Sequence, residues 1–140
     1  MTGVSLDRFV KAQEHSYETA LNEMRRGRKS SHWMWYIFPQ IKGLGFSPTA
    51  QYYAIEDREE AEEYMKHPLL SKRLFEISEE LLKLDSSDPR MVMGCPDDLK
   101  LKSSMTLFYL VSGSEVFRQV LHKFYQGKLD EKTVRILEKG

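Results

Sequence analysis

Residues 5–27, SLDRFVKAQEHSYETALNEMRRG, decide the fold class of this chain. Their apolar side chains recur at spacings of three and four residues, which is typical of an amphipathic helix. These side chains are Leu6, Phe9, Val10, Tyr17, Ala20, Leu21 and Met24. Ser5 is suited to cap the start of this helix, and Gly27 is suited to end it. The stretch therefore predicts a long helix near the N-terminus.

Further helices are predicted along the rest of the chain, with short turns between them. Their expected ranges are 48–53, 57–67, 68–84, 96–113, 116–127 and 130–137. Most of them begin at a capping residue or at a proline, which is tolerated in the first turn of a helix. These starting residues are Ser47 with Pro48, Asp57 with Glu60, Pro68, Pro96 and Asp130.

The apolar run at residues 31–38 is too short to have a decisive period, so a helix and a strand both fit it. Its helical neighbours favour the helix. We therefore expect an all-α fold, a single domain over residues 1–140 built as an irregular bundle of about seven or eight helices. Because alternating strands and helices are missing, a Rossmann-like fold is not expected. Residues 43–45, Gly-Leu-Gly, are interpreted as a turn.

Composition restricts the function. The 21 Lys and Arg residues balance 21 Asp and Glu residues, so no global field attracts nucleic acid or an anionic membrane. The apolar run at 33–38 is far shorter than the roughly 20 residues that span a bilayer. With one cysteine and no signal-peptide pattern, we expect a cytoplasmic protein without a disulfide. The sequence implies no cofactor and defines no oligomeric state.

Residues 28–40, RKSSHWMWYIFPQ, form the first half of a predicted site. Arg28 and Lys29 are suited to bind phosphate. His32 is a candidate catalytic residue, because histidine side chains titrate near neutral pH and serve as acids or bases. A hydroxyl, two indoles and an amide complete the predicted ligand-binding set. These belong to Ser31, Trp33, Trp35 and Gln40.

A structural interpretation of the same residues stays open. Cations at the end of a helix complement its dipole, and large aromatic side chains are more often core anchors than stacking surfaces. Trp33 and Trp35 would point about 200° apart on a helix, so at most one of them would line a pocket. The four histidines lack metal-ligand spacing, and no metal site is predicted.

The second half of the predicted site lies at the start of the helix expected from residue 96. Asp97 and Asp98 join His32 as candidate catalytic residues, and Lys100, Ser103 and Ser104 are candidate ligand-binding residues. One carboxylate of such a pair can stabilise an oxocarbenium ion or orient water in glycosidic chemistry. The structural alternative is a capped helix start with exposed ion pairs.

Helical spacing predicts different partners for the two acids. Asp97 would meet Lys100 and Ser104, whereas Asp98 would meet Lys102. Two carboxylates with different partners would differ in proton affinity, which suits a division of catalytic roles.

Four motifs together resemble one known family, the domain-of-unknown-function family 1810. They are SHWMWYIFPQ at 31–40, HPLL at 67–70, PDDLK at 96–100 and SSMTLF at 103–108. The resemblance covers nearly the whole chain and implies a small, largely helical, bacterial-type cytoplasmic protein with no assigned reaction. The family is often mislabelled as calpastatin in genomes, but such an inhibitor would be disordered and repetitive, unlike this aromatic-rich chain.

A second resemblance begins at residue 91 and is looser. The segments MVM at 91–93, LKLK at 99–102 and VFRQVL at 116–121 are similar to parts of the NADAR proteins, which are linked to ADP-ribose and N-glycosidic bonds. This resemblance implies a chemistry for the predicted site without carrying over catalytic residues.

Two functions of different classes fit these observations. The first is a site for a nucleotide-like or phosphate-containing small molecule, with hydrolysis of an N-glycosidic bond in an ADP-ribose-type ligand as its enzymatic form. The alternative is a non-enzymatic domain that binds a protein or nucleic acid. The first requires His32, Gln40 and Asp97 to converge in a concavity. The second would leave an exposed apolar patch instead.

Overall fold

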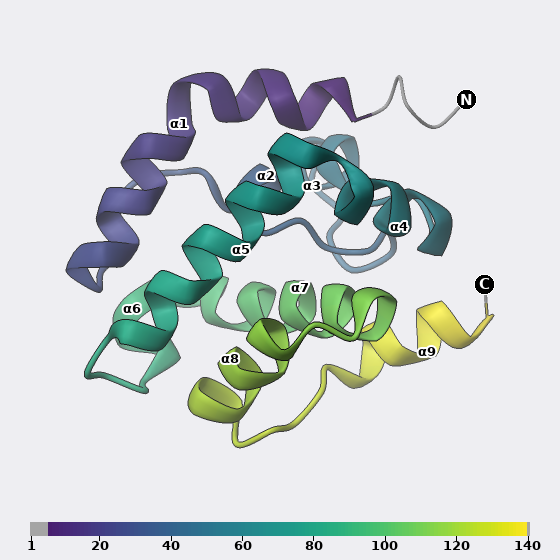
Figure 1. Ribbon diagram of the computed structural model, residues 1–140. Helices are drawn as coiled ribbons and strands as arrows, with labels where there is room; N and C mark the ends of the chain where they lie inside the picture. The colour runs from purple at the N-terminus through teal and green to yellow at the C-terminus, as the bar shows by residue number, and fades with distance from the viewer. Residues whose placement is uncertain (1–5, 140) are drawn as a thin grey trace.

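The structure is a computed structural model that describes residues 6–139 (Figure 1). Nine helices make up the regular structure of this part of the chain, and the all-α fold is confirmed. They are α1 (Asp7–Arg26), α2 (Met34–Ile37), α3 (Pro48–Tyr53), α4 (Arg58–Lys66), α5 (Pro68–Lys83), α6 (Pro89–Met93), α7 (Asp97–Ser112), α8 (Glu115–Tyr125) and α9 (Glu131–Lys139). No helix within residues 6–139 is both long and apolar enough to cross a membrane.

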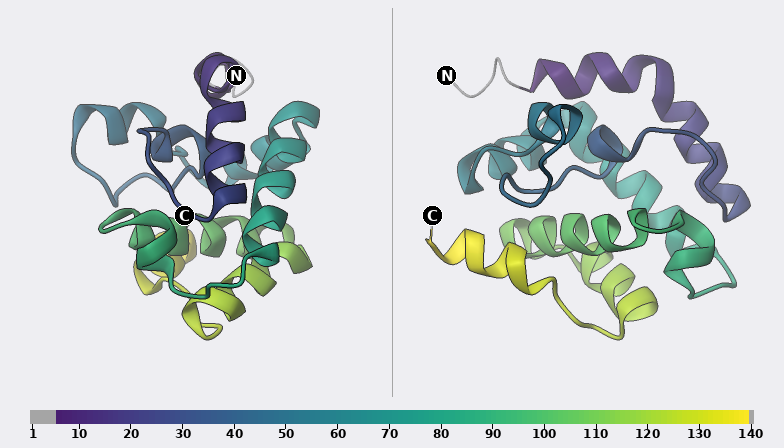
Figure 2. Two further views of the ribbon diagram at one scale, coloured as in Figure 1. Left: turned by 90° about the vertical axis from the view of Figure 1, so that its left-hand side faces the viewer. Right: turned by 180° about the vertical axis from the view of Figure 1, so that it is seen from behind.

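Helix α7 lies at the centre of the bundle. It packs against α4, α6, α8 and α9, while α5 contacts both α1 and α8 (Figures 1 and 2). Residues 103–108 of α7 are all buried, so this helix is enclosed on every side rather than along a single stripe. Polar groups at its N-terminal end therefore lie between several neighbouring elements.

Most predicted helix ends match the structure. Gly27 adopts a left-handed conformation, φ 80°, at the end of α1. The Ser47 side chain accepts a hydrogen bond from the Ala50 N–H at the start of α3. Asp130 does the same for the Thr133 N–H at the start of α9. The predicted cap Ser5 lies outside the described residues.

Three local expectations differ from the structure. A ninth helix, α6, begins at Pro89 and is capped by the Asp88 side chain, whereas no helix was predicted between residues 84 and 96. Pro96 precedes α7 instead of occupying its first position. In the ambiguous segment 31–38, only Met34–Ile37 is helical, which confirms the helix but shortens it.

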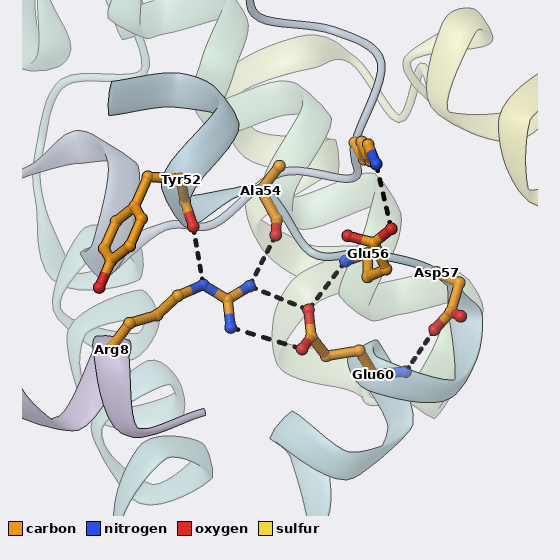
Figure 3. A network of polar contacts seen from close by, with 7 residues as sticks. Arg8, Tyr52, Ala54, Glu56, Asp57 and Glu60 are labelled. Atoms are coloured by element: carbon orange, nitrogen blue, oxygen red, sulfur yellow. Dashed lines mark hydrogen bonds and ion pairs between the residues drawn. The ribbon is translucent and has the colours of Figure 1, made fainter. Parts of the chain in front are cut away.

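Arg8 fastens α1 to the connection between α3 and α4 (Figure 3). Its guanidinium donates to the carbonyl oxygens of Tyr52 at 2.8 Å and Ala54 at 2.7 Å. It also forms an ion pair with the buried carboxylate of Glu60 at 3.0 Å. That carboxylate accepts the Glu56 N–H as well. The network fixes residues 52–60, against which the loop after Gln40 packs.

The start of α4 is capped as the pairing of Asp57 with Glu60 predicted. The Asp57 side chain accepts the Glu60 N–H at 2.9 Å (Figure 3). The Glu60 carboxylate accepts the Glu56 N–H at 2.8 Å and also binds Arg8.

Candidate functional site

Glu23, on the last turns of α1, organises the first half of the predicted site. Its carboxylate accepts hydrogen bonds from the Ser31 hydroxyl at 2.5 Å and from the Trp33 indole N–H at 2.8 Å. It also accepts the backbone N–H groups of Ser30 and Ser31 at 2.8 and 3.0 Å. Only 2% of Glu23 is exposed, and Trp33 is 1% exposed. Ser31 and Trp33 therefore hold residues 30–33 against α1 through hydrogen bonds to a buried carboxylate.

These donors keep Glu23 charged although it is buried. Burial by itself raises the pKa of the carboxyl group, but the hydrogen bonds from Ser31, Ser30 and Trp33 outweigh it. The pKa falls from the ordinary 4.5 to about 2. Sequence reasoning missed Glu23, because an acid on an amphipathic helix is normally on the solvent face.

Lys29 joins the two halves of the predicted site. Its Nζ lies 2.8 Å from Oδ2 of Asp97, at the start of α7, and only 8% of its side chain is exposed. The same ammonium donates to the Ser31 carbonyl at 2.6 Å and lies 5.0 Å from the centre of the Trp33 ring. Lys29 and Asp97 are 68 residues apart in the sequence, so this ion pair brings the two motifs together in space.

Asp97 extends this connection toward solvent. Its Oδ1 lies 3.6 Å from Nζ of Lys100, one turn along α7, as the helical spacing predicted. The Lys100 ammonium in turn lies 5.4 Å from the centre of the Trp35 ring, and Trp35 is half-buried. Lys29, Asp97, Lys100 and Trp35 thus form a continuous series from the core to the surface.

A groove opens beside Lys100, between residues 40–45, α7 and α9. Its volume is about 530 Å³. Three residues of the predicted site line it, namely Gln40, Lys100 and Ser103. The sequence missed three further cations that line it, which are Lys102, Lys132 and Arg135. Its apolar lining comes from Leu44, Leu99 and Leu129.

Backbone contacts hold the loop that forms one wall of the groove. The Gln40 carbonyl accepts the Ile55 N–H at 2.8 Å, and the Ile55 carbonyl accepts the Lys42 N–H at the same distance. Gly45 packs so closely on α3 that an added Cβ would lie 2.7 Å from the Ala50 Cβ. The Gln40 side-chain amide, by contrast, makes no hydrogen bond within residues 6–139, and Gln40 is one of the residues that line the groove.

The opposite wall, the start of α9, is fixed to α7. The Asp130 N–H donates to the buried Thr106 hydroxyl at 2.9 Å. The Asp130 carboxylate accepts both the N–H and the hydroxyl of Thr133. Thr106, a buried hydroxyl on the central helix, therefore positions α9.

Several predicted site residues lie away from the groove. Arg28 and His32 are exposed and do not line it. Trp35 lines a separate small pocket of about 10 Å³, which shares Gln40 and Gly45 with the groove. Of the three residues that the ligand-site hypothesis expected to converge, only Gln40 lines the groove, whereas Asp97 and His32 do not.

Asp98 and Ser104 are buried in the bundle. Asp98 is 7% exposed and its Oδ1 has no hydrogen-bond partner, while its carbonyl accepts the Tyr125 hydroxyl at 2.5 Å. Burial, together with the Asp98 charge, raises the pKa of Tyr125. The Ser104 hydroxyl also lacks a partner. Within the described residues the predicted contacts from Asp98 to Lys102 and from Asp97 to Ser104 are absent.

A pattern for the missed cations is present in the sequence. Lys132 and Arg135 are three residues apart, which places them on one face of α9. Nothing local, however, indicates that this face meets Lys102 of α7. No group of three or more His, Cys, Asp or Glu side chains with metal-binding geometry occurs within residues 6–139.

Fold and site together define an all-α helical protein with a basic groove between its central helix and its C-terminal helix. The chain belongs to a family described as "Protein of unknown function (DUF1810)", whose model matches residues 3–137. This confirms the first resemblance.

The chain is also similar to a solved structure, the crystal structure of the conserved hypothetical protein Rv1873 from Mycobacterium tuberculosis. The two are 44% identical with a TM-score of 0.93, over 95% of this chain and 96% of that chain. No curated protein matches the chain. Neither finding supports the resemblance to the NADAR proteins.

Proposed function

We propose that this protein binds a phosphate-containing, nucleotide-like small molecule in the groove between residues 40–45, α7 and α9. The observation that carries the proposal is a concavity of about 530 Å³ that combines a free amide with four cations. Ligand sites commonly have volumes of about 300–1,000 Å³ and a few converging polar groups on an apolar lining. The amide is that of Gln40, and the cations are Lys100, Lys102, Lys132 and Arg135.

The charges of the groove favour an anion. Lys102 and Lys132 form no ion pair within the described part of the chain. The two acids at the groove are Asp130, which is engaged with Thr133, and Glu131, which lies 4.0 Å from Arg135. Cations gathered in a concavity attract an anionic ligand more strongly than the same cations spread over a surface.

An aromatic side chain next to the groove suits a base. Trp35 is half-buried and lies in the small pocket that adjoins the groove at Gln40. Stacking of a nucleobase on an aromatic ring contributes about 1–3 kcal/mol. Gln40 offers both a donor and an acceptor for the edge of such a base.

The finer proposal is hydrolysis of an N-glycosidic bond in an ADP-ribose-type ligand. Asp97 supports it, because the pair with Lys100 holds a carboxylate beside the groove. We rank binding above hydrolysis, since Asp97 already pairs with Lys29 and Lys100, and Asp98 is buried. Release of the free base from ADP-ribose or NAD, followed by chromatography, tests this step with Asp97→Asn as the comparison.

Thermal shift and isothermal titration calorimetry test the binding proposal. The probes are AMP, ADP, ADP-ribose, NAD and inorganic phosphate. A ligand at a hundred times its dissociation constant stabilises the folded state by about 2.7 kcal/mol. We expect a selective shift that Lys102→Ala and Gln40→Ala reduce. Lys72→Ala, an exposed lysine on α5, is the matched control and should retain the full shift. A flat response to every probe would refute the proposal.

A non-enzymatic interaction domain is the second candidate. It is favoured by large apolar side chains on the surface, with Phe46 79% exposed, Met91 68% and Leu99 60%. Leu99 lines the groove and Phe46 follows Gly45, so these side chains also fit the rim of a ligand site. A flat thermal-shift screen combined with capture of a defined protein or single-stranded nucleic acid would favour this candidate.

A further inference from the structure

The groove continues beyond the part that contains Gln40. A second compartment of about 480 Å³ shares Lys102, Leu129, Glu131 and Arg135 with it and adds Lys128 and Val134. Each compartment by itself is of the size of many small-molecule sites. The two compartments adjoin along these shared residues, and Lys128 lines only the second of them.

The two ends differ in chemistry. The end at residues 40–45 combines the Gln40 amide with apolar Leu44 and Leu99. The other end has no such amide, and it adds only Lys128 and Val134 to the four residues that both compartments share. One end thus suits a ring with hydrogen-bonding edges, and the other suits charged oxygen atoms.

The cations of the second compartment are available to a ligand. Lys102 and Lys128 form no ion pair within residues 6–139. Arg135 is 61% exposed in its side chain and lies 4.0 Å from Glu131, so solvent screens that contact strongly. Unpaired cations held near one another repel, and a phosphate group between them relieves this repulsion.

We infer that the ligand is extended and carries at least two consecutive phosphate groups, as in a nucleoside diphosphate. Its ring end lies at Gln40, and its terminal phosphate lies between Lys102, Lys128 and Arg135. This inference rests on the proposed function, because it assigns an orientation and a phosphate number to the ligand of the same groove. Lys128 then determines specificity for the second phosphate without contacting the ring.

A calorimetric series of adenosine, AMP, ADP and ATP tests the inference on the full chain. Affinity should increase from adenosine to AMP and again, by about tenfold, from AMP to ADP, as expected for an added charge-assisted contact. Lys128→Ala should remove most of the gain from AMP to ADP and leave AMP within about twofold of wild type. Gln40→Ala should weaken AMP and ADP equally. Lys72→Ala serves as the matched surface-charge control.

The outcomes separate this inference from the proposed function. Equal affinity of AMP and ADP for the wild-type protein, or equal weakening of both by Lys128→Ala, overturns the inference while the proposed function stands. Binding of none of the four compounds overturns both. A short single-stranded oligonucleotide that displaces ADP at lower concentration than unlabelled ADP itself would also overturn the inference, since the groove would then follow a nucleic-acid backbone.

Discussion

Two charged regions flank the first turns of α7, and their charges are satisfied to very different degrees. At the junction with residues 29–33, Glu23 accepts hydrogen bonds from several donors and Lys29 pairs with Asp97. In the groove on the other side, Lys102 and Lys132 form no ion pair within the described residues. A buried charge is tolerated only when it has partners. The comparison therefore predicts a structural role for the junction, and it leaves the groove as the proposed ligand site.

Glu23→Gln should have the largest effect on folding. The amide nitrogen cannot accept a hydrogen bond, so donors among Ser31, Trp33 and the Ser30 backbone lose their acceptor inside the protein. We expect the free energy of unfolding to fall by about 3 kcal/mol, measured by urea denaturation with circular dichroism. Glu14→Gln, at an exposed position on the same helix, is the control and should stay within about 0.5 kcal/mol of wild type. If Glu23→Gln were as stable as wild type, the structural role assigned to the junction would be wrong.

Lowering the pH should reduce the difference in unfolding free energy between wild type and Glu23→Gln. The pKa of Glu23 is about 2 in the folded protein against an ordinary 4.5, so between these values the unfolded state binds a proton that the folded state does not. The contribution of this carboxylate is complete above about pH 5 and is lost as the pH falls toward 2. Wild type and Glu23→Gln should thus converge in stability on acidification. Urea titrations at several pH values that keep a constant difference between the two proteins would contradict the assigned pKa.

Gly45→Ala tests whether the wall of the groove at residues 40–45 depends on the close contact between Gly45 and Ala50. Its Cβ would lie 2.7 Å from the Ala50 Cβ, so the loop must shift away from α3. We expect a loss of about 1–2 kcal/mol in stability and weaker binding of ADP, measured by denaturation and calorimetry. Ala50→Gly removes the opposing methyl group. In that background the substitution at Gly45 should leave ADP affinity unchanged, and a persistent loss would show that the contact is not its cause.

The fold was largely predictable, because most of its elements are specified locally. The stripe on α1, the left-handed stop at Gly27 and the side-chain caps at Ser47 and Asp130 all act within a few residues. The short helix α6 was missed, since a five-residue helix after a polar turn has no measurable periodicity. Predicting it required the capping role of Asp88, which lies between the helices expected at 68–84 and 96–113.

The candidate site was predictable only in part, because its groups depend on tertiary contacts. The helical rule gave the pair of Asp97 with Lys100. No local rule could show that Lys29 reaches Asp97, that Glu23 turns inward, or that α9 covers α7. The predicted contact between Asp98 and Lys102 was wrong for the same reason. Asp98 is buried, and its backbone carbonyl accepts the Tyr125 hydroxyl.

Lys132→Ala should have the smallest effect on folding. It therefore best separates the role of the groove from that of the junction. The side chain is exposed and unpaired within the described residues, and its removal should change the free energy of unfolding by less than about 0.5 kcal/mol. The affinity for ADP should fall by about fivefold at low salt, with a smaller difference at high salt because added ions screen an exposed charge. Lys72→Ala, measured by the same calorimetry and denaturation, separates loss of a groove cation from loss of any surface cation. A loss of stability comparable to that of Glu23→Gln would mean that the groove cations hold the bundle together, and the division between a structural junction and a binding groove would fail.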